Sequence, residues 1–485
     1  MTDLAFSPAK RLARLIREKK IGCLELLEHY LARVARHDPK LNSIVATRLP
    51  AARKAARAAD AALRKRGAKL GPLHGVPMTV KESFDVAGLP TTWGLAEFKH
   101  HRAKTHALAV ERMLAAGANV FGKTNVPVML ADWQSFNPVY GTTNNPWDLT
   151  RGPGGSSGGS AAALAAGLTG LEYGSDIGAS IRNPAHYCGV YGHKPTYRIV
   201  SPRGQHLGDA VSVADITAIG PLARSADDLE IALRATAGPD PIDGTGWKLA
   251  LVSPKWNSAR GLRVAVMLTH PTAEVDASVQ APIHALARFL AHKGARVSER
   301  ARPRFDPDEA HKVYIQLLRF ATSGRQPDEQ YRRFEQQKNS IAADDYSYYA
   351  QFVRGTTMAP RDWARLNERR HQMRLAWADF FRDWDVLLCP TAATAAFAHM
   401  QTGERWERML SVNGRPQPTT TQMFWAGYSG MCFLPSTVAP VGLTKQGLPV
   451  GVQIVGPQYG DLATIRFAQL IEREYCAFVP PPSFI

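Results

Sequence analysis

The sequence predicts an α/β fold in which a largely parallel or mixed sheet is covered by helices. Short apolar, β-branched runs alternate with longer segments of helical periodicity, which is the pattern of repeated βα units. With 45% hydrophobic residues, the chain has enough apolar side chains for a large buried core. Its 485 residues would by length alone suggest roughly two or three domains.

The helices predicted in the first half begin and end at recognisable signals. Ser7-Pro8 opens the first one, and Ser225 opens the last one, which Gly238 ends. We expect helices at residues 8–19, 23–37, 49–66, 105–116, 161–167 and 225–238. We expect the strands between them at residues 42–46, 73–80, 118–124 and 171–173.

The second half continues the alternation after a loop at residues 239–259. Residues 307–383 are dominated by helical patterns rich in Arg, Gln and aromatic residues. Further strands are expected at 262–268, 295–297 and 384–391, and further helices at 276–292 and 462–475. Residues 434–455 alternate apolar runs with turns, which we interpret as a hairpin at the edge of the sheet.

The positive charge is concentrated at the N-terminus. The formal net charge is +17, and residues 1–70 hold 17 Lys and Arg against 6 Asp and Glu. Such a segment could contact nucleic acid or an anionic surface. Few aromatic residues interleave these charges and no nucleic-acid motif accompanies them, so the pattern favours the solvated outer faces of helices.

Cysteine use and hydropathy indicate a cytoplasmic location. The five cysteines are an odd number without a C-x-x-C pair, which argues for a reducing compartment and against a disulfide framework or a structural zinc site. The N-terminus lacks the basic start and apolar core of a signal peptide. The sequence also has no run of about 18 or more apolar residues, so we expect no membrane-spanning helix.

Two glycine–serine clusters lie between residues 151 and 196. Ser156 stands in the first, P-G-G-S-S-G-G, and Ser180 in the second, D-I-G-A-S-I-R. A G-G-S-S-G-G segment alone is typical of a flexible linker. Gly154-x-Ser156-x-Gly158 also matches the nucleophile elbow of α/β-hydrolases, which leaves an esterase using Ser156 as an alternative. The elbow needs an apolar strand before it, and N-P-W-D-L-T-R-G-P is a poor strand.

A phosphate-loop match at residues 117–124 is rejected. G-x-x-x-x-G-K-T requires a strand before the loop and a helix after it, so that the helix N-terminus faces phosphate. Here a helix precedes Gly117, and Pro127 discourages helix formation after Thr124. We expect a helix end at Gly117 followed by a core strand.

Lys81 offers a base for the two serines. It ends the apolar segment V-P-M-T-V-K, and burial lowers the pKa of a lysine far enough to leave it neutral near pH 7. Ser156 would then relay a proton between Lys81 and Ser180, provided that Glu82 and Asp85 point away. The backbone N–H groups of Ile177, Gly178, Ala179 and Ser180 would form an oxyanion hole.

The same segments resemble the amidase signature family. The resemblance rests on G-V-P-M-T-V-K-E, G-K-T-N-V-P, G-G-S-S-G-G-S-A-A-A-L-A-A-G, S-D-I-G-A-S-I-R-N-P-A, C-G-V-Y-G-H-K-P-T and L-P-V-G-V-Q-I-V-G. It implies a Ser–cis-Ser–Lys triad in which Ser180 is the nucleophile, Ser156 the bridging serine after a cis peptide bond, and Lys81 the base. It implies neither a metal nor a cofactor.

The resemblance also implies one large domain with a mixed, mostly parallel twisted β-sheet covered by helices, spanning residues 1–485. Within it we expect basic N-terminal helices at 1–70 and a signature core with the catalytic residues at 71–240. A helical, substrate-side region would follow at 241–380, and residues 381–485 would complete the sheet.

One position departs from the family pattern. The family most often has D-x-G-G-S at the nucleophile, whereas this chain has Ala179 in place of the second glycine. The extra methyl should alter the fit of the pocket or shift φ away from positive values. His193 stands where leucine is usual, and we expect a structural role for it.

Further residues are assigned supporting roles by position. Asp176 and Arg182 flank the nucleophile and would brace its loop, with a surface ion pair as the alternative. Ser157 would hydrogen-bond Lys81 or Ser156. The candidate substrate-binding residues are Met129, Leu130, Trp133, Phe424, Trp425 and Tyr428.

These residues predict an amidohydrolase that cleaves the C–N bond of a small-molecule carboxamide through a Ser180 acyl-enzyme. The apolar wall candidates favour a neutral, hydrophobic or aryl amide. A glutaminase subunit of a tRNA-dependent amidotransferase is an alternative within the family, and a non-catalytic binding protein is one from another class. The oligomeric state stays open, with a homodimer as one option.

Overall fold

The computed structural model describes residues 4–485, which form one α/β domain around a large mixed sheet. The eight strands of this sheet lie in the order β10-β9-β11-β15-β14-β7-β8-β6. Their bounds are β6 Glu172–Asp176, β7 Tyr191–Lys194, β8 Ala218–Ala223, β9 Arg263–Val266, β10 Arg296–Ser298, β11 Val386–Pro390, β14 Ser436–Leu443 and β15 Pro449–Val455. Residues 1–3, the start of the predicted basic segment, lie outside the described part.

The sheet is mixed as predicted, but the expectation that most strand pairs are parallel is wrong. Within this sheet, as residues 4–485 form it, only β9 pairs in parallel, with β10 and with β11. The pairs from β11 through β15, β14, β7 and β8 to β6 are all antiparallel. The βα alternation indicates which segments are strands and helices, but it does not determine which strands become neighbours or in which direction they run.

The C-terminal hairpin also lies elsewhere than predicted. β14 and β15 occupy the middle of the sheet, between β7 and β11, and not its edge. Every residue of β15 is buried, as are the first six residues of β14. A strand that is covered on both faces has a near-continuous apolar sequence, and this is the pattern of these two segments.

A second sheet of three strands lies beside the large one, in the order β1 (Ile44–Thr47), β3 (Asn119–Thr124), β2 (Pro77–Lys81). β2 runs next to the edge strand β6, where the Thr79 N–H donates to the Thr169 hydroxyl at 3.0 Å. The rejected phosphate-loop segment forms the end of a helix and strand β3, as expected. Lys123 within it donates to the Pro90 carbonyl.

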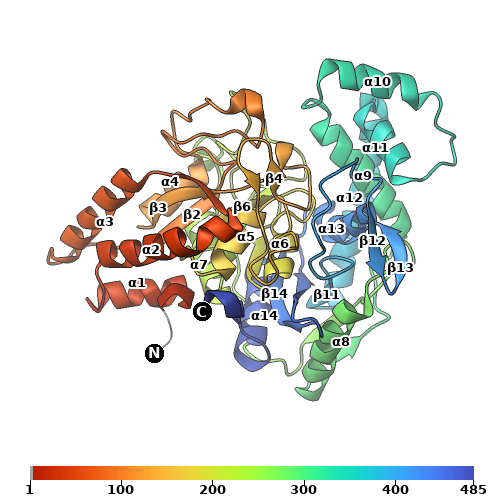
Figure 1. Ribbon diagram of the computed structural model, residues 1–485. Helices are drawn as coiled ribbons and strands as arrows, with labels where there is room; N and C mark the ends of the chain where they lie inside the picture. Colours follow the sequence, from red (N-terminus) through yellow and green to blue (C-terminus); the bar gives the residue numbers. More distant parts are fainter. Residues whose placement is uncertain (1–3) are drawn as a thin grey trace.

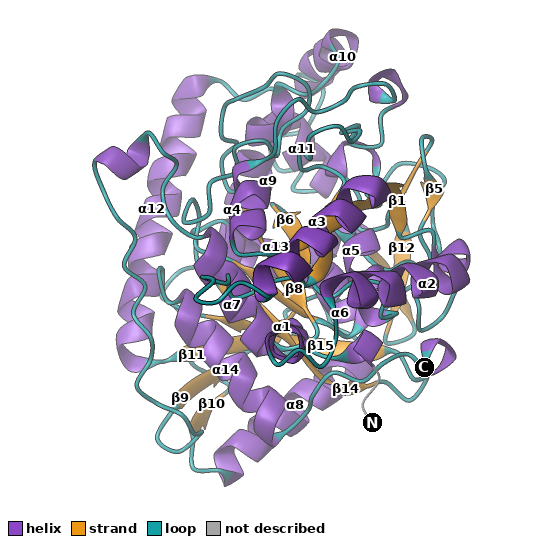
Figure 2. Ribbon diagram, turned by 90° about the vertical axis from the view of Figure 1, so that its left-hand side faces the viewer, coloured by secondary structure: helices purple, strands orange, loops and turns teal. Residues whose placement is uncertain are grey.

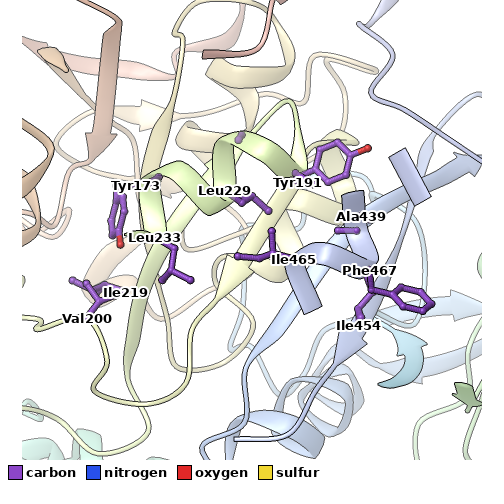
Figure 3. Close-up of a cluster of buried hydrophobic side chains, with 14 of the residues drawn as sticks. Tyr173, Tyr191, Val200, Ile219, Leu229, Leu233, Ala439, Ile454, Ile465 and Phe467 are labelled. Carbon is purple, nitrogen blue, oxygen red and sulfur yellow. The ribbon is translucent and has the colours of Figure 1, made fainter. Parts of the chain in front are cut away.

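Helices cover both faces of the large sheet, so that the strands lie inside a shell of helices (Figure 2). One face carries α5 (Gly158–Ala165) and α6 (Arg182–Cys188), and the other carries α7 (Ala226–Thr236), α8 (Ala277–His292) and α14 (Asp461–Glu474). Figure 3 shows part of the core, where Leu229 and Leu233 of α7 and Ile465 of α14 pack over the strands.

The remaining helices form two groups at opposite sides of the molecule (Figure 1). The first comprises α1 Ala9–Arg17, α2 Cys23–Leu41, α3 Leu49–Leu63 and α4 Leu108–Ala115. The second comprises α9 Pro307–Ser323, α10 Asp328–Lys338, α11 Tyr348–Thr356, α12 Pro360–Asp383 and α13 Met423–Gly430, with the small hairpin β12 (Met409–Val412) and β13 (Arg415–Pro418) beside them. A two-residue pair, β4 (Phe136–Asn137) and β5 (Gly141–Thr142), completes the strands.

Two buried hydrogen bonds explain the histidine at position 193. His193 has the structural role expected of it, because its ring bonds Thr437 Oγ1 at 2.9 Å and Asp461 Oδ1 at 3.1 Å inside the core.

All five cysteines are free thiols. In residues 4–485 we find no helix with the length and apolar character needed to cross a bilayer.

Candidate active site

Adjacent strands bring Lys81 and the second glycine–serine cluster together. Lys81 is the last residue of β2, and Asp176 is the last residue of the neighbouring β6. Since the two strands run side by side in the same direction, their C-terminal ends meet at one place. The apolar segment before Lys81 is fully buried and carries its amino group into the interior, where its exposed fraction is 0%.

The Lys81 amino group contacts two serine hydroxyls. Its Nζ donates to Ser156 Oγ at 2.6 Å and to Ser175 Oγ at 2.9 Å. Burial lowers the pKa of Lys81 to about 7, against the opposing effects of Asp176 and Glu82. A lysine with this pKa is partly neutral at physiological pH and can accept a proton.

Glu82 points away from Lys81, as the predicted chemistry requires. Its two carboxylate oxygens accept the backbone N–H groups of Thr92 at 2.6 Å and Trp93 at 3.0 Å. Burial raises the pKa of Asp85, and interactions with Thr91 and Lys123 lower it, so this carboxyl group interacts with groups other than Lys81. The two acidic side chains next to Lys81 in sequence are therefore engaged elsewhere.

The first glycine–serine cluster is tightly packed and is not a linker. A Cβ at Gly155 would lie 2.4 Å from the Asp132 carbonyl oxygen, and one at Gly158 would lie 2.3 Å from Ser135 Oγ. Ser156 is 1% exposed, and its peptide bond to Gly155 is cis, as the resemblance implied. The segment before it is a loop, so the strand that a nucleophile elbow needs is missing there.

Ser180 lies in the loop that joins β6 to α6. The Ser157 N–H donates to the Ser180 carbonyl at 3.1 Å, which ties the two glycine–serine clusters together. The hydroxyls of Ser156 and Ser180 line the same cavity, and no hydrogen bond joins them in the described part of the chain. The proton relay therefore requires a change of serine rotamer on substrate binding, which would bring the Ser156 and Ser180 hydroxyls within hydrogen-bond distance.

The loop that carries Ser180 is clamped through its carbonyl groups. Tyr314 Oη donates to the Ile177 carbonyl at 2.9 Å, and the indole N–H of Trp133 donates to the Gly178 carbonyl at 2.7 Å. A carbonyl and the following N–H point in opposite directions across a peptide plane. These two bonds to carbonyl oxygens therefore fix the directions of the N–H groups that follow.

Ala179 keeps a positive φ of 68°, so the expectation that its methyl shifts φ away from positive values is wrong. Its N–H donates to Asp176 Oδ1 at 2.9 Å. This bond removes Ala179 from the predicted set of oxyanion donors. Among the described residues we find no acceptor for the N–H groups of Ile177, Gly178 and Ser180, which stay available.

Asp176 and Arg182 form a buried pair and not a surface one. Both side chains are 0% exposed, and Arg182 Nη2 lies 2.8 Å from Asp176 Oδ1. Burial opposes ionisation, but Arg182 and the surrounding N–H donors hold the pKa of Asp176 below its ordinary value. Arg182 Nη1 also donates to Gln453 Oε1 at 2.6 Å, so the pair fastens the Ser180 loop to β15.

Ser157 does not contact Lys81 or Ser156 as predicted. Its hydroxyl donates to the Ser175 carbonyl at 3.4 Å, and Ser175 supplies the second hydroxyl at Lys81. Gln205 Nε2 in turn donates to Ser175 Oγ at 3.3 Å. The sequence shows Ser175 only as the residue before Asp176, and its contact with Lys81 depends on the packing of β2 against β6.

A cavity of about 1150 Å³ opens over these residues. Ser156, Ser175 and Ser180 lie in its wall, together with the predicted Met129, Leu130 and Trp133. The predicted Phe424, Trp425 and Tyr428 do not line it.

The three aromatic residues of α13 belong to the core. Phe424 stacks on His270 with ring centroids 4.6 Å apart, and Trp425 donates to the Ala273 carbonyl at 3.2 Å. Tyr428 packs against Trp377. α13 is buried around most of its circumference, and only Met423, at its first residue, lines the cavity.

Comparisons with known proteins agree with this geometry. The family profile described as amidase matches residues 25–465. The chain is 33% identical to a glutamyl-tRNA(Gln) amidotransferase subunit of Anaeromyxobacter sp. (strain K), over 98% of this chain and 99% of that one. It is 32% identical to the indoleacetamide hydrolase of Bradyrhizobium diazoefficiens, over 95% of this chain and 85% of that one.

Solved structures with the same fold include amide hydrolases. 6-Aminohexanoate cyclic dimer hydrolase superposes with a TM-score of 0.77 at 27% identity, over 96% of this chain and 97% of that one. A bacterial aryl acylamidase of the amidase signature family superposes with a TM-score of 0.81 at 24% identity, over 96% of both chains.

Proposed function

Because the chain belongs to the amidase signature family and is an amide-hydrolysing enzyme, we propose that Ser180 is its nucleophile, Lys81 its general base and Ser156 the relay between them. The observation that carries this proposal is the hydrogen bond between the buried Lys81 amino group and Ser156 Oγ at 2.6 Å. Because the pKa of Lys81 is lowered to about 7, part of the protein carries a neutral Lys81 at physiological pH, and this neutral amine can accept the proton of Ser156.

In the acylation step, neutral Lys81 takes the proton of Ser156 while Ser156 takes the proton of Ser180. Ser180 Oγ bonds to the amide carbon, and the oxygen that becomes negative faces the N–H groups of Ile177, Gly178 and Ser180. When the C–N bond breaks, the proton returns from Lys81 through Ser156 to the leaving nitrogen. The products of this step are a free amine or ammonia and an ester on Ser180.

Deacylation uses the same relay, with water in place of Ser180 as the nucleophile. A water molecule gives its proton through Ser156 to Lys81 and attacks the ester carbon at the same oxyanion site. Collapse of this second intermediate breaks the bond to Ser180 Oγ, which recovers the proton from the relay. The acid leaves, and Lys81 is neutral again for the next cycle.

We propose a hydrophobic or aryl amide as the substrate. The cavity that contains the serines is also lined by Trp93, Met129, Leu130 and Trp133, and their apolar side chains suit an apolar acyl group. The name of the indoleacetamide hydrolase relative describes an aryl amide of this kind.

A glutaminase subunit of a tRNA-dependent amidotransferase is the second candidate, because relatives named for glutamyl-tRNA(Gln) amidotransferase match the chain from end to end. The two candidates differ in what the isolated chain does. An amidase turns over aryl and aliphatic amides by itself, whereas a subunit of that complex would favour glutamine and depend on partner proteins. Salt-sensitive RNA binding by the chain would also favour the second candidate.

The test combines a substrate panel with trapping of the acyl-enzyme. Ser180→Ala should abolish the covalent adduct in intact-protein mass spectrometry, and Ser156→Ala and Lys81→Met should each lower kcat by at least about 10². Ser253→Ala, at an exposed serine of the surface, is the matched control. An adduct on Ser156 together with full activity of Ser180→Ala would replace this mechanism with the elbow esterase.

A further inference from the structure

We propose that the cavity holds a carboxylate of the substrate through Arg319, Arg325 and Arg405, so that the amide is apolar near Ser180 and anionic further out. This inference rests on the proposed function and names the substrate class more closely. The substrate predicted from the sequence is a neutral amide, whereas the substrate proposed here carries a carboxylate in addition to its amide. The evidence is an excess of guanidinium groups in the cavity wall that the protein itself does not neutralise.

Within residues 4–485, no acidic side chain of the cavity wall forms an ion pair with these three arginines. Asp132 is paired with Arg408, whose Nη1 lies 2.6 Å from its Oδ2. Asp215 is paired with Arg370 at 2.7 Å. The remaining acid of the wall, Glu97, is exposed at the surface and has no ion pair in the described part of the chain.

Arg319, Arg325 and Arg405 line the cavity, and none of them forms an ion pair within residues 4–485. Arg319 is only 7% exposed, and its Nε has no hydrogen-bond partner. Its Nη2 donates to the Tyr348 hydroxyl, and Arg405 Nη1 donates to the Ala131 carbonyl. These neutral acceptors leave both positive charges without a counter-ion.

A guanidinium that is removed from water without a counter-ion is unfavourable, and a bound anion removes this penalty. Burial and the positive charge of Arg319 both lower the pKa of Arg405. Both stay protonated, because an arginine does not lose its proton in a protein. Planar forks of N–H donors match the two oxygens of a carboxylate.

The position of the arginines sets the length of the substrate. α9 touches the Ser180 loop through Tyr314, whose hydroxyl bonds the Ile177 carbonyl at 2.9 Å. Arg319 follows five residues later, which is about 7.5 Å further along the helix axis. Arg325 lies just beyond the end of the same helix, with its guanidinium 4.9 Å from the centre of the Trp93 ring. An aryl spacer between the amide and the acid fits this separation and would pack beside Trp93.

Arg319 also has a packing role, because its guanidinium lies 4.8 Å from the ring centre of Phe352 on α11. A loss of activity in an Arg319 variant would therefore not separate binding from folding. The test uses Arg405→Gln and Arg325→Gln, with Arg415→Gln as the control. Arg415 is an exposed arginine that pairs with Glu274 on the surface.

The substrates are 4-(carbamoylmethyl)benzoate and its near-isosteric neutral partner, 4-acetylphenylacetamide, with ammonia release as the readout. We expect kcat/KM of the wild type to be at least about tenfold higher for the acid, which is the effect of one charge-assisted hydrogen bond. In Arg405→Gln and Arg325→Gln this preference should fall several-fold, mainly through KM for the acid. Arg415→Gln should keep the preference of the wild type.

A binding measurement separates failure of this inference from failure of the mechanism. Calorimetry with the Ser180→Ala protein should show tighter binding of the acid than of the ketone, and adding Arg405→Gln should remove the difference. Equal turnover and equal binding of the two amides would overturn the carboxylate site while leaving the amidase intact. Preferential binding of the acid by a protein that hydrolyses neither amide would overturn the proposed function and keep the carboxylate site. If Arg405→Gln does not fold, Arg325→Gln, at the more exposed arginine, provides the test instead. Its ratio of kcat/KM for the acid to kcat/KM for the neutral amide should then be lower than that of the wild type.

Discussion

The pH dependence of acylation tests the role of Lys81 most directly. Its pKa is lowered from 10.5 to about 7 by burial, although Asp176 and Glu82 act in the opposite direction. A general base works only when it is neutral, so kcat/KM should rise as the pH increases through the folded pKa. With a pKa of about 7, the neutral fraction is roughly 0.09 at pH 6 and roughly 0.9 at pH 8. We therefore expect kcat/KM for an uncharged amide to increase about tenfold between these two pH values.

Lys194 provides the control, because burial lowers its pKa to about 7 as well. Its Nζ donates to the Pro195 carbonyl at 3.0 Å, and it does not line the cavity. Plots of kcat/KM against pH between pH 5 and 9.5 should show the inflection in Lys194→Met but not in Lys81→Arg, because the arginine side chain stays charged. The rate of Lys81→Arg should also fall by about 10²–10⁴, since it has lost the general base. A flat wild-type profile between pH 6 and 8, or an inflection that disappears with Lys194, would refute the assignment.

Three further predictions concern the loop that carries Ser180. Asp176→Asn should lower the free energy of unfolding by roughly 3–5 kcal/mol in urea titrations, because it leaves the Arg182 charge buried without its counter-ion. Trp133→Phe keeps the ring but removes the N–H donor to the Gly178 carbonyl, so we expect a loss of about 1 kcal/mol in stability and a lower kcat in steady-state assays. Ala179→Gly should raise the melting temperature and add up to about 1 kcal/mol, because glycine adopts a φ of 68° without a Cβ clash.

Each of these has a contrary outcome. Wild-type stability of Asp176→Asn would mean that Arg182 is satisfied by its neutral partners alone. A change in KM without a change in kcat for Trp133→Phe would assign the indole to substrate binding instead of to the loop. A destabilised Ala179→Gly would mean that the alanine methyl contributes more by packing than it costs through its backbone conformation.

The sequence was sufficient for the parts of the site that follow from local patterns. Lys81 ends an apolar run, and a buried amine near neutral pH follows from that position. Ser156 and Ser180 each stand among small residues that permit close packing. Most helices of the fold also lie where their periodicity and their capping residues placed them.

The sequence was insufficient wherever function depends on contacts between distant segments. Ser175 meets Lys81 only because β2 lies beside β6. Tyr314 reaches the Ser180 loop from α9, more than a hundred residues away, and no local motif marks it. Phe424 was assigned to the substrate wall by its aromatic character, but an aromatic side chain suits a buried helix equally well.

Ala179 shows how these levels combine. A non-glycine residue with positive φ is unfavourable by roughly 1–2 kcal/mol, and such a conformation persists where its surroundings determine it. Here Asp176 accepts the Ala179 N–H, while Trp133 fixes the carbonyl of the same peptide unit. That N–H therefore points toward the carboxylate and away from the substrate, whichever residue occupies the position. The departure from the family pattern therefore falls on an amide that the Asp176 carboxylate engages, which explains how an alanine can stand there while the oxyanion donors on either side are kept.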